Sequence, residues 1–414
     1  MIRYGIVGVG GFAGTWVRSL RTLEGQGIAN LEAAVIRNPT KYPEQVAVLR
    51  DAGRPIYATL DEMLAEGHGR LDVIGVPTGI PYHEPMAVQA MEAGYNVVIE
   101  KPAAGTIQEV ERMAAAVQRT GRWCGVGYQQ IYSPSIQWLR NKILDGSLGR
   151  LVEARSVICW PRPLSYYERN AWAGKLRSND RWILDGPATN ATAHFINHMT
   201  YLTQASEGDD FAIRTVRAEL YRAKPIETYD TSSIEIITER GTRLYHYVTH
   251  SCVGSIEPTS VFECEKGTVY WERSGDSLRV EYRDGSREEF QNPDPAYVHA
   301  GFLAQIARVA AGEEPAPLCG IAEAAPQVLV INLAFESCRG ILQIPEENTY
   351  TVDANGSPLV AIQGIEDAMR TAFEKGGMLS DQDLSWAQQT EAMSPEGYTS
   401  FPSESLGEIL QAML

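Results

Sequence analysis

An alternation of short β-rich runs with longer segments of helical period, over the first 125 residues, limits the possible folds more than any other feature. This alternation is typical of repeated βαβ units, whose strands form a parallel sheet between two layers of helices. The expected strands cover residues 3–7, 31–36, 71–76, 96–99 and 121–127, and the expected helices cover 12–23, 60–66, 84–93 and 106–119. We therefore predict an α/β fold that starts with a doubly wound Rossmann domain over residues 1–125.

After about residue 151 the pattern changes to a single helical segment, 187–202, followed by a series of strand-like runs. These runs cover residues 215–220, 233–238, 243–249, 260–265, 268–272, 277–282 and 287–291, and short turns separate them. Many of them alternate apolar with polar residues, which predicts an open, mainly antiparallel sheet with one wet face. We expect an α+β domain for substrate binding and oligomerisation over residues 126–350, with helices at 300–311 and 321–339, and a helical C-terminal extension over 351–414.

Composition excludes several classes of protein. The 414 residues carry 36 Lys and Arg against 52 Asp and Glu, a formal charge of −16, so that nucleic acid would be repelled. The six cysteines are widely spaced without a CxxC pair, which argues against a disulfide framework and a zinc site. No apolar run approaches the roughly 20 residues that cross a bilayer, and the first residues lack the features of a signal peptide. We expect a soluble cytoplasmic protein without membrane contact.

The segment Gly8-Val9-Gly10-Gly11-Phe12-Ala13 has the pattern G-x-G-x-x-[GA] between the first expected strand and the first expected helix. In this position Gly8 permits a tight turn, Gly10 lets the backbone approach a pyrophosphate, and Ala13 keeps the helix close to the sheet. The amides of the helix start then face the anion. The motif predicts a dinucleotide site that includes Gly11 and Phe12.

The second expected strand ends in Arg37-Asn38, where many dinucleotide sites have an acidic residue for the ribose hydroxyls. Arg37 can pair with a 2′-phosphate and stack on adenine, and Lys41 is close in sequence. The cofactor that these residues favour is NADP, with NAD as the alternative.

Farther along the chain, Asp72-Val73-Ile74-Gly75-Val76-Pro77-Thr78 precedes His83, and Val97-Val98-Ile99 leads into Glu100-Lys101-Pro102. With the glycine-rich start, this Glu-Lys-Pro signature resembles the glucose-fructose oxidoreductase, inositol dehydrogenase and rhizopine-catabolism (Gfo/Idh/MocA) family, over roughly residues 1–345.

The resemblance implies a Rossmann domain followed by an α/β domain with an open, mainly antiparallel sheet. It implies that Lys101 lies beside the nicotinamide and the substrate hydroxyl, where a lysine can bind the oxygen that becomes a carbonyl. Glu100 would orient the lysine or the nicotinamide side of the site. Pro77, Thr78 and His83 would line the cofactor pocket.

Members of this family carry D-x-G-x-H-x-x-D at a helix start in the second domain, and residues 190–197 (NATAHFIN) are its nearest counterpart. His194 matches, whereas both acids are replaced, by Asn190 and Asn197. We expect one helical face to carry these three residues, with His194 as the general acid/base beside Lys101 and Asn190 as a partner of a substrate hydroxyl. Asp185 could cap this helix or supply the missing carboxylate. A metal pair of His194 with the histidine four residues later is rejected, because no third ligand is evident.

Aromatic and basic residues are dense between residues 160 and 182. Such rings suit sugar faces, and the polar groups between them suit hydroxyls. The residues expected to border a carbohydrate are Trp160, Arg162, Trp172 and Lys175.

These features predict an oxidoreductase that transfers hydride between NADP(H) or NAD(H) and a secondary alcohol of a sugar, polyol or glycoside. One alternative is a cofactor-retaining enzyme that cleaves glycosides through a 3-keto sugar. Another is a non-catalytic regulator that senses nucleotide. We expect no metal and a homo-oligomer that associates through the C-terminal sheet.

Overall fold

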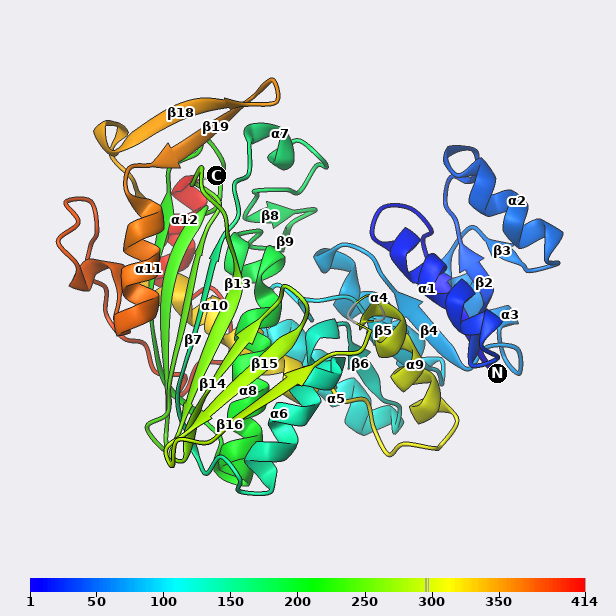
Figure 1. Cartoon of the computed structure of the whole chain (residues 1–414). Helices are drawn as coiled ribbons and strands as arrows, with labels where there is room; N and C mark the ends of the chain where they lie inside the picture. Colours follow the sequence, from blue (N-terminus) through cyan, green and yellow to red (C-terminus); the bar gives the residue numbers. More distant parts are fainter. Residues whose placement is uncertain (295, 297, 414) are drawn as a thin grey trace. The chain divides into compact units, whose positions relative to one another are not determined.

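The computed structural model describes residues 1–294, 296 and 298–413, and the chain divides into two compact units (Figure 1). Unit 1 comprises Met1–Ser133 and Asp294–Ala325, and unit 2 comprises Pro134–Pro293 and Pro326–Leu414. This division differs from the expected one in two respects. The first unit includes a later segment of the chain, and the residues after 350 belong to unit 2 and form no separate extension.

Unit 1 contains a six-stranded parallel sheet with the order β3-β2-β1-β4-β5-β6. Its strands are β1 (Ile2–Val7), β2 (Ala29–Val35), β3 (Ile56–Tyr57), β4 (Val73–Val76), β5 (Asn96–Ile99) and β6 (Cys124–Val126). The direction of winding reverses between β1 and β4. The strand order confirms the predicted Rossmann architecture. In such sheets, ligands bind at the carboxyl ends of the strands where the direction of winding reverses.

The helices of unit 1 are α1 (Ala13–Gly25), α2 (Pro43–Asp51), α3 (Leu60–Glu66), α4 (His83–Glu92), α5 (Ile107–Thr120), α9 (Val298–Ala310) and the start of α10 (Ile321–Cys338). Helix α9 packs on α1 although almost 300 residues separate them in sequence. Trp16 of α1 meets Phe302 of α9 edge to face at 5.7 Å, and the Tyr4 hydroxyl donates to the Leu303 carbonyl at 2.8 Å. The core of unit 1 is therefore completed by a distant segment.

Unit 2 contains a nine-stranded sheet with the order β16-β15-β14-β13-β7-β12-β11-β10-β17. The strands are β7 (Leu151–Cys159), β10 (Ile213–Arg222), β11 (Thr231–Thr238), β12 (Arg243–Thr249), β13 (Ile256–Cys264), β14 (Gly267–Glu272), β15 (Ser277–Tyr282), β16 (Arg287–Gln291) and β17 (Leu342–Gln343). The sequence did not predict β7, which runs parallel to β12 and antiparallel to β13 at the centre of the sheet. The sheet is thus mixed but mainly antiparallel, as expected.

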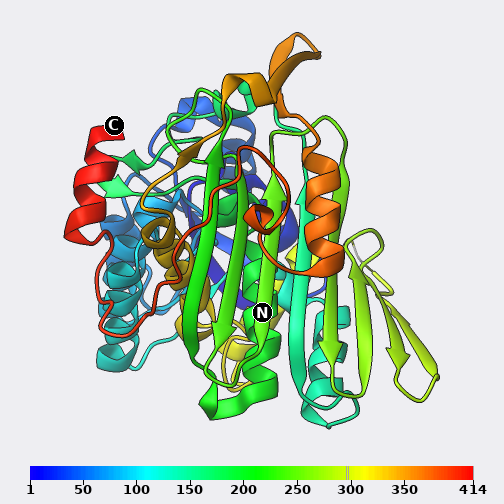
Figure 2. The ribbon, with the colours of Figure 1, turned by 90° about the vertical axis from the view of Figure 1, so that its left-hand side faces the viewer.

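Opposite faces of this sheet carry different helices, as Figures 1 and 2 show for α8 (Ala193–Glu207) and α11 (Ile365–Lys375). The helix α6 (Pro134–Leu144) lies beside α8. The expected helical extension instead contains a hairpin of β18 (Thr349–Ala354) and β19 (Ser357–Ile362), then α11, an irregular segment and α12 (Glu404–Met413).

The C-terminal residues cover the sheet face on which α11 lies. Tyr245 and Tyr247 of β12 belong to one buried cluster with Met369, Leu379 and Trp386. In Figure 2, α11 and the red chain after it cross in front of the green strands. Residues of the same chain thus occupy this part of the sheet surface, and the expected association through the C-terminal sheet stays a prediction.

A buried carboxylate fastens this covering segment to the sheet. Glu219 of β10 accepts hydrogen bonds from the Ser380 hydroxyl at 2.5 Å and from the Tyr221 hydroxyl at 2.9 Å. Burial raises the pKa of Glu219 to about 7.

None of the helices in the described part of the chain is both long enough and apolar enough to cross a membrane.

Candidate functional site

The loop between β1 and α1 has the conformation of an anion-binding turn. Gly8 and Gly11 have φ angles of +88° and +56°, in the left-handed region that favours glycine. Across the described residues, the backbone amides of Gly10, Gly11 and Phe12 donate no hydrogen bond, and α1 begins immediately afterwards, at Ala13. Amides of this kind at a helix start are a binding site for phosphate.

Gly10 has a role that the sequence did not reveal. A Cβ atom on residue 10 would lie 2.3 Å from Cε1 of Tyr42, which precedes α2. The space that a Cβ atom at residue 10 would need is thus filled by a tyrosine ring. The Lys41 ammonium lies 5.7 Å from the centroid of that ring. Any side chain on residue 10 would displace Tyr42, so packing alone requires glycine here.

The end of β2 presents positive charge. Arg37 and Lys41 are exposed, and Arg37 forms no ion pair with any residue that the structure describes. The neighbouring Asn38 accepts a hydrogen bond from the Thr40 hydroxyl at 2.7 Å. The Asn38 side chain therefore already makes a hydrogen bond within its own turn, and this bond competes with its expected binding of the cofactor. The Arg37 guanidinium is available to a ligand.

His83 is buried and holds together the loops that follow β4 and β5. Its Nδ1 lies 2.9 Å from the Pro102 carbonyl, its Nε2 lies 3.1 Å from the Thr78 carbonyl, and none of its surface is exposed. Burial lowers the pKa of His83, and the charge of Lys101 lowers it further. The expectation that His83 lines the cofactor pocket is wrong for its side chain, because both ring nitrogens already face backbone carbonyls.

Pro77 and Thr78 directly follow β4, as expected. Pro77 is buried, and the Thr78 hydroxyl is shielded from water but has no hydrogen-bond partner in the described part of the chain. A shielded hydroxyl normally has a partner, and a bound ligand would supply one.

Glu100 occupies a buried position directly after β5. Its Oε1 accepts hydrogen bonds from the Trp16 indole at 2.8 Å and from the Gln129 amide at 3.1 Å, and its Oε2 accepts from the Lys101 backbone amide at 3.1 Å. Burial raises the pKa of Glu100 to about 7, although the Lys101 charge and the Trp16 bond oppose this shift. Glu100 thus positions the backbone of Lys101. Nothing in the sequence marked Trp16 or Gln129 as its partners.

The half-buried Lys101 and the other candidate cofactor residues share one edge of unit 1. The glycine loop follows β1, Arg37 follows β2, Thr78 follows β4 and Lys101 follows β5, and these strands are parallel neighbours. Unpartnered amides, an unpaired guanidinium and an unpartnered hydroxyl at this edge fit the phosphates, the ribose and the polar ring substituents of a dinucleotide.

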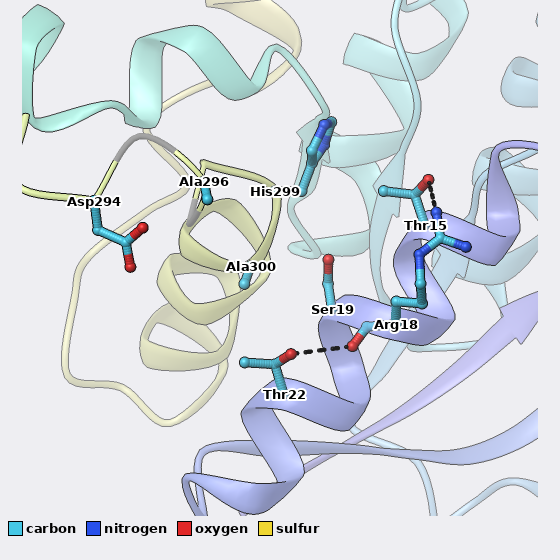
Figure 3. A pocket seen from close by; sticks show the side chains of 8 residues that line it. All are labelled: Thr15, Arg18, Ser19, Thr22, Asp294, Ala296, His299 and Ala300. Carbon is cyan, nitrogen blue, oxygen red and sulfur yellow. Dashed lines mark hydrogen bonds between the residues drawn. The ribbon is translucent and has the colours of Figure 1, made fainter. Parts of the chain in front are cut away.

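A separate pocket of about 280 Å³ lies between α1 and the start of α9 (Figure 3). It contains none of the predicted site residues. Its polar groups include Thr15, Arg18 and Thr22. The Arg18 guanidinium donates to the Thr15 hydroxyl at 2.9 Å, and the Thr22 hydroxyl donates to the Arg18 carbonyl at 3.3 Å. Because these groups bond one another, we do not include this pocket in the candidate site.

In unit 2 the predicted helix 187–202 is interrupted. Pro187–Ala191 forms a π-helical turn, and α8 begins only at Ala193. The Thr192 hydroxyl between them donates to the Pro187 carbonyl at 3.0 Å and lies 3.0 Å from Nε2 of the buried His246. This anchored turn separates the predicted Asn190 from the regular helix that carries His194.

The expected polar face is therefore only partly correct. His194 is half-buried, whereas Asn197 has no exposed surface and cannot face a cleft. His198 is also fully buried, and its Nε2 lies 3.3 Å from the Ser260 hydroxyl. Burial lowers the pKa of His198 to about 3, as expected for a neutral core histidine. Residues 1–294, 296 and 298–413 contain no group of three His, Cys, Asp or Glu side chains that could hold a metal ion.

Asp185 places a carboxylate beside Asn190. Its Oδ1 accepts from the Asn190 side-chain amide at 2.8 Å, and its Oδ2 accepts from the Gly174 backbone amide at 2.8 Å. The Arg169 guanidinium lies 3.6 Å from the same carboxylate, which is 5% exposed. Asp185 therefore fixes the orientation of Asn190, and it also joins the π-helical turn to the aromatic segment.

The predicted substrate residues of the aromatic segment between residues 160 and 182 fall into two groups. The Arg162 guanidinium carbon lies 5.3 Å from the centroid of the Trp160 ring, and that of Arg169 lies 5.5 Å from the centroid of the Trp172 ring. Lys175 is exposed and instead lies 3.5 Å from Glu227, at a different pocket. The Lys175 side chain thus lies apart from the cluster that adjoins Asp185, although its backbone carbonyl accepts from the Asp185 amide at 2.9 Å.

The predicted residues belong to both units. Those predicted for the cofactor lie in unit 1, whereas Trp160, Arg162, Trp172, Lys175, Asn190 and His194 lie in unit 2. The sequence did not single out Tyr42, Trp16 or Gln129, since their importance depends on contacts with distant residues.

Comparison with known proteins identifies similar sequences and structures. A family model described as "Oxidoreductase family, NAD-binding Rossmann fold" (GFO_IDH_MocA) matches residues 2–128. Inositol 2-dehydrogenase 1 of Saccharopolyspora erythraea is 27% identical over 198 residues, 47% of this chain and 57% of that protein. A glycosyl hydrolase family 109 protein of Shewanella putrefaciens is 26% identical over 162 residues, 38% of this chain and 35% of that protein. The matches thus span about half, or less, of these relatives.

The fold as a whole also has solved counterparts. The WlbA dehydrogenase of Bordetella pertussis, solved in complex with NADH and UDP-GlcNAcA, has a TM-score of 0.65 at 23% identity. That match covers 82% of this chain and 96% of the other, so it includes elements of both units. With the Glu-Lys-Pro signature after β5, these findings show that residues 2–128 are similar to the NAD-binding Rossmann domain of the Gfo/Idh/MocA oxidoreductase family.

Proposed function

We propose that this protein is a nicotinamide-dependent oxidoreductase that transfers hydride between NADP(H) or NAD(H) and a secondary alcohol of a sugar, polyol or glycoside. The observation that carries the proposal is Lys101 at the carboxyl end of β5, with its backbone amide bonded to the buried Glu100. An ammonium group at this edge of a dinucleotide-binding sheet can bind the oxygen that changes from hydroxyl to carbonyl. The relatives named as inositol dehydrogenases support the same class of substrate.

A bound nicotinamide would supply the acceptor for the hydride of the carbinol carbon. The hydroxyl proton goes to a base, and we assign Lys101 and His194 as the acid/base groups. Asn190 is held by Asp185, and we assign its side chain as a partner of a substrate hydroxyl.

The test is a rate measurement with NADP or NAD and a panel of sugars and polyols, which follows the absorbance of the reduced nicotinamide. Lys101→Met and His194→Asn should each lower kcat at least about a hundredfold, as expected for loss of an acid/base group. Lys266→Met is the control, because this exposed lysine only donates to the Gly146 carbonyl. Full rates in both site variants would refute the assignment.

We further propose a preference for NADP over NAD. The exposed Arg37 without an ion-pair partner, and the nearby Lys41, support it, since a 2′-phosphate would pair with either charge. Arg37→Gln should raise the KM for NADP about tenfold and leave that for NAD unchanged. Arg50→Gln, on the exposed side of α2, is the matched control. An unchanged ratio of the two KM values would contradict the preference.

A second candidate is glycoside cleavage with a retained cofactor, in which a transient 3-keto sugar eases elimination of the glycosidic substituent. The match to a glycosyl hydrolase family 109 protein favours this candidate. It predicts cleavage of a chromogenic glycoside without added cofactor, together with dinucleotide released from the denatured protein. Stoichiometric reduction of added NADP by free sugars would favour the dehydrogenase instead.

A further inference from the structure

Six side chains of unit 2 form a row in which arginines and aromatic rings alternate. The distances from guanidinium carbon to ring centroid are 5.3 Å for Arg273 on Trp160, 5.3 Å for Arg162 on Trp160, 5.0 Å for Arg162 on Tyr166, 3.8 Å for Arg169 on Tyr166 and 5.5 Å for Arg169 on Trp172. The sequence singled out the segment from 160 to 172 but not Arg273, which reaches the row from the turn between β14 and β15.

The positive charges of this row are only partly neutralised. Arg169 pairs with Asp185, whose carboxylate also bonds Asn190 and the Gly174 amide. Arg162 and Arg273 form no ion pair with any residue that the structure describes. Both guanidinium groups approach the Trp160 ring, and no ion pair with a described residue offsets the repulsion between them. This is notable because the whole chain carries a formal charge of −16.

Two buried polar atoms beside the row also have no partner among the described residues. Arg162 Nε is shielded from water and makes no hydrogen bond. His250 is 2% exposed, its Nδ1 lies 3.0 Å from the Tyr167 hydroxyl, and its Nε2 is unpartnered. The ring of His250 meets that of Tyr166 edge to face at 5.7 Å. Burial and the charges of Arg162, Lys224 and Arg169 lower the pKa of His250, so this imidazole is neutral and does not add to the repulsion.

We propose that the substrate of this protein carries an anionic oxygen group, a carboxylate or a phosphate ester, and that Arg162 and Arg273 bind it beside Trp160. The inference rests on the proposed function, because it specifies the class of sugar that the same site accepts. The row adjoins the π-helical turn through the pair of Arg169 with Asp185 and the bond from Asn190 to Asp185. The anionic group is therefore bound in a row of side chains that leads, through Arg169 and Asp185, to Asn190, the residue assigned to a substrate hydroxyl.

Stacked arginines suit this task. A guanidinium that lies against a ring keeps its N–H groups available at the edge, in a planar fork that matches two oxygens of a carboxylate or phosphate. The ring holds the side chain in place before the ligand arrives, which reduces the entropy lost on binding. The Trp160 ring beside both charges can contact the apolar face of a sugar at the same time.

The experiment measures equilibrium binding to the full-length protein by calorimetry, with glucose, glucuronate and glucose 6-phosphate as probes. Glucose is the neutral reference, glucuronate tests a carboxylate, and glucose 6-phosphate tests a phosphate ester. At least one anionic sugar should bind about tenfold more tightly than glucose. Arg162→Gln and Arg273→Gln should each remove about tenfold of that affinity, and Arg162→Lys, which keeps the charge without the planar fork, should have an intermediate effect.

Arg279→Gln is the matched control. Arg279 also stacks on an aromatic ring, at 4.2 Å from the centroid of Tyr270, but it is paired with Glu281. Its substitution should leave the affinity for all three sugars unchanged. The proposal is overturned if glucose binds as tightly as both anionic sugars, if neither anionic sugar binds, or if the two Gln variants keep the affinity of the unmodified protein. Failure of hydride transfer would show separately in the nicotinamide absorbance, because sugar binding requires no turnover.

Discussion

Replacement of Glu100 by glutamine should change how the stability of unit 1 depends on pH. Glu100 is 5% exposed and accepts hydrogen bonds from Trp16, Gln129 and the Lys101 backbone amide. Glutamine can keep its carbonyl oxygen toward Trp16 and Gln129, but its NH2 group cannot accept from the Lys101 N–H, as an oxygen of the protonated carboxyl still can. The variant should therefore lose this hydrogen bond at every pH, and residue 100 should no longer make the stability depend on pH because glutamine does not titrate.

The magnitude follows from the pKa of Glu100, which burial raises from an ordinary 4.5 to about 7. A raised pKa means that the folded state favours the neutral acid. The contribution of Glu100 to the free energy of unfolding is therefore fully present below pH 4.5, falls as the pH rises, and is lost above about pH 7. At about 1.4 kcal/mol for each pKa unit, the loss over this window is about 3 kcal/mol. The free energy of unfolding of the Glu100→Gln variant should not show this decrease between pH 4.5 and 7.

The assay is hydrogen exchange in urea, corrected for intrinsic rates, on peptides from β5 at several pH values. Glu219→Gln is the matched control, because the pKa of Glu219 is also raised to about 7 but its carboxylate lies in unit 2. It should flatten the pH dependence of β10 peptides and leave those of β5 unchanged. Retention of the full fall between pH 4.5 and 7 by Glu100→Gln would refute the reasoning.

Three further substitutions test other contacts. His83→Leu should lower the stability of unit 1 by about 1–3 kcal/mol in urea unfolding, because the neutral imidazole donates its one N–H to the Pro102 or the Thr78 carbonyl and leucine removes that hydrogen bond; an unchanged midpoint would contradict this. Asp185→Asn should lower kcat about tenfold and leave the Kd for the dinucleotide unchanged, because the new side chain has one acceptor oxygen for the two amides of Asn190 and Gly174; initial rates and fluorescence titration separate the two effects. Lys224→Met should lower stability by about 3 kcal/mol, because the buried ammonium donates to three acceptors, one of them in β19. Faster hydrogen exchange of residues 349–362 is the measurement, and normal protection there would count against the reasoning.

Much of unit 1 was predictable because its signals are local. The run 96–99 and the helix 60–66 were predicted with the bounds that the structure has, since apolar periodicity and a capping box define them within a few residues. The two-residue strand β3 was missed because so short a strand carries no period. The continuous helix from residue 187 was wrong because His246, distant in sequence, anchors Thr192 and stabilises a π-helical turn.

For the candidate site, the residue pattern alone sufficed to predict the glycine turn after β1. It also located the Glu-Lys-Pro signature at a strand end and showed that no acidic residue directly follows β2. These features depend on φ angles, strand ends and neighbouring residues, which a short stretch of chain encodes. The roles of Tyr42 at Gly10, of Trp16 at Glu100 and of Arg273 in the row emerged from the folded chain. Each depends on a contact between residues far apart in sequence, and only packing of the folded core specifies which distant side chain fills a given space.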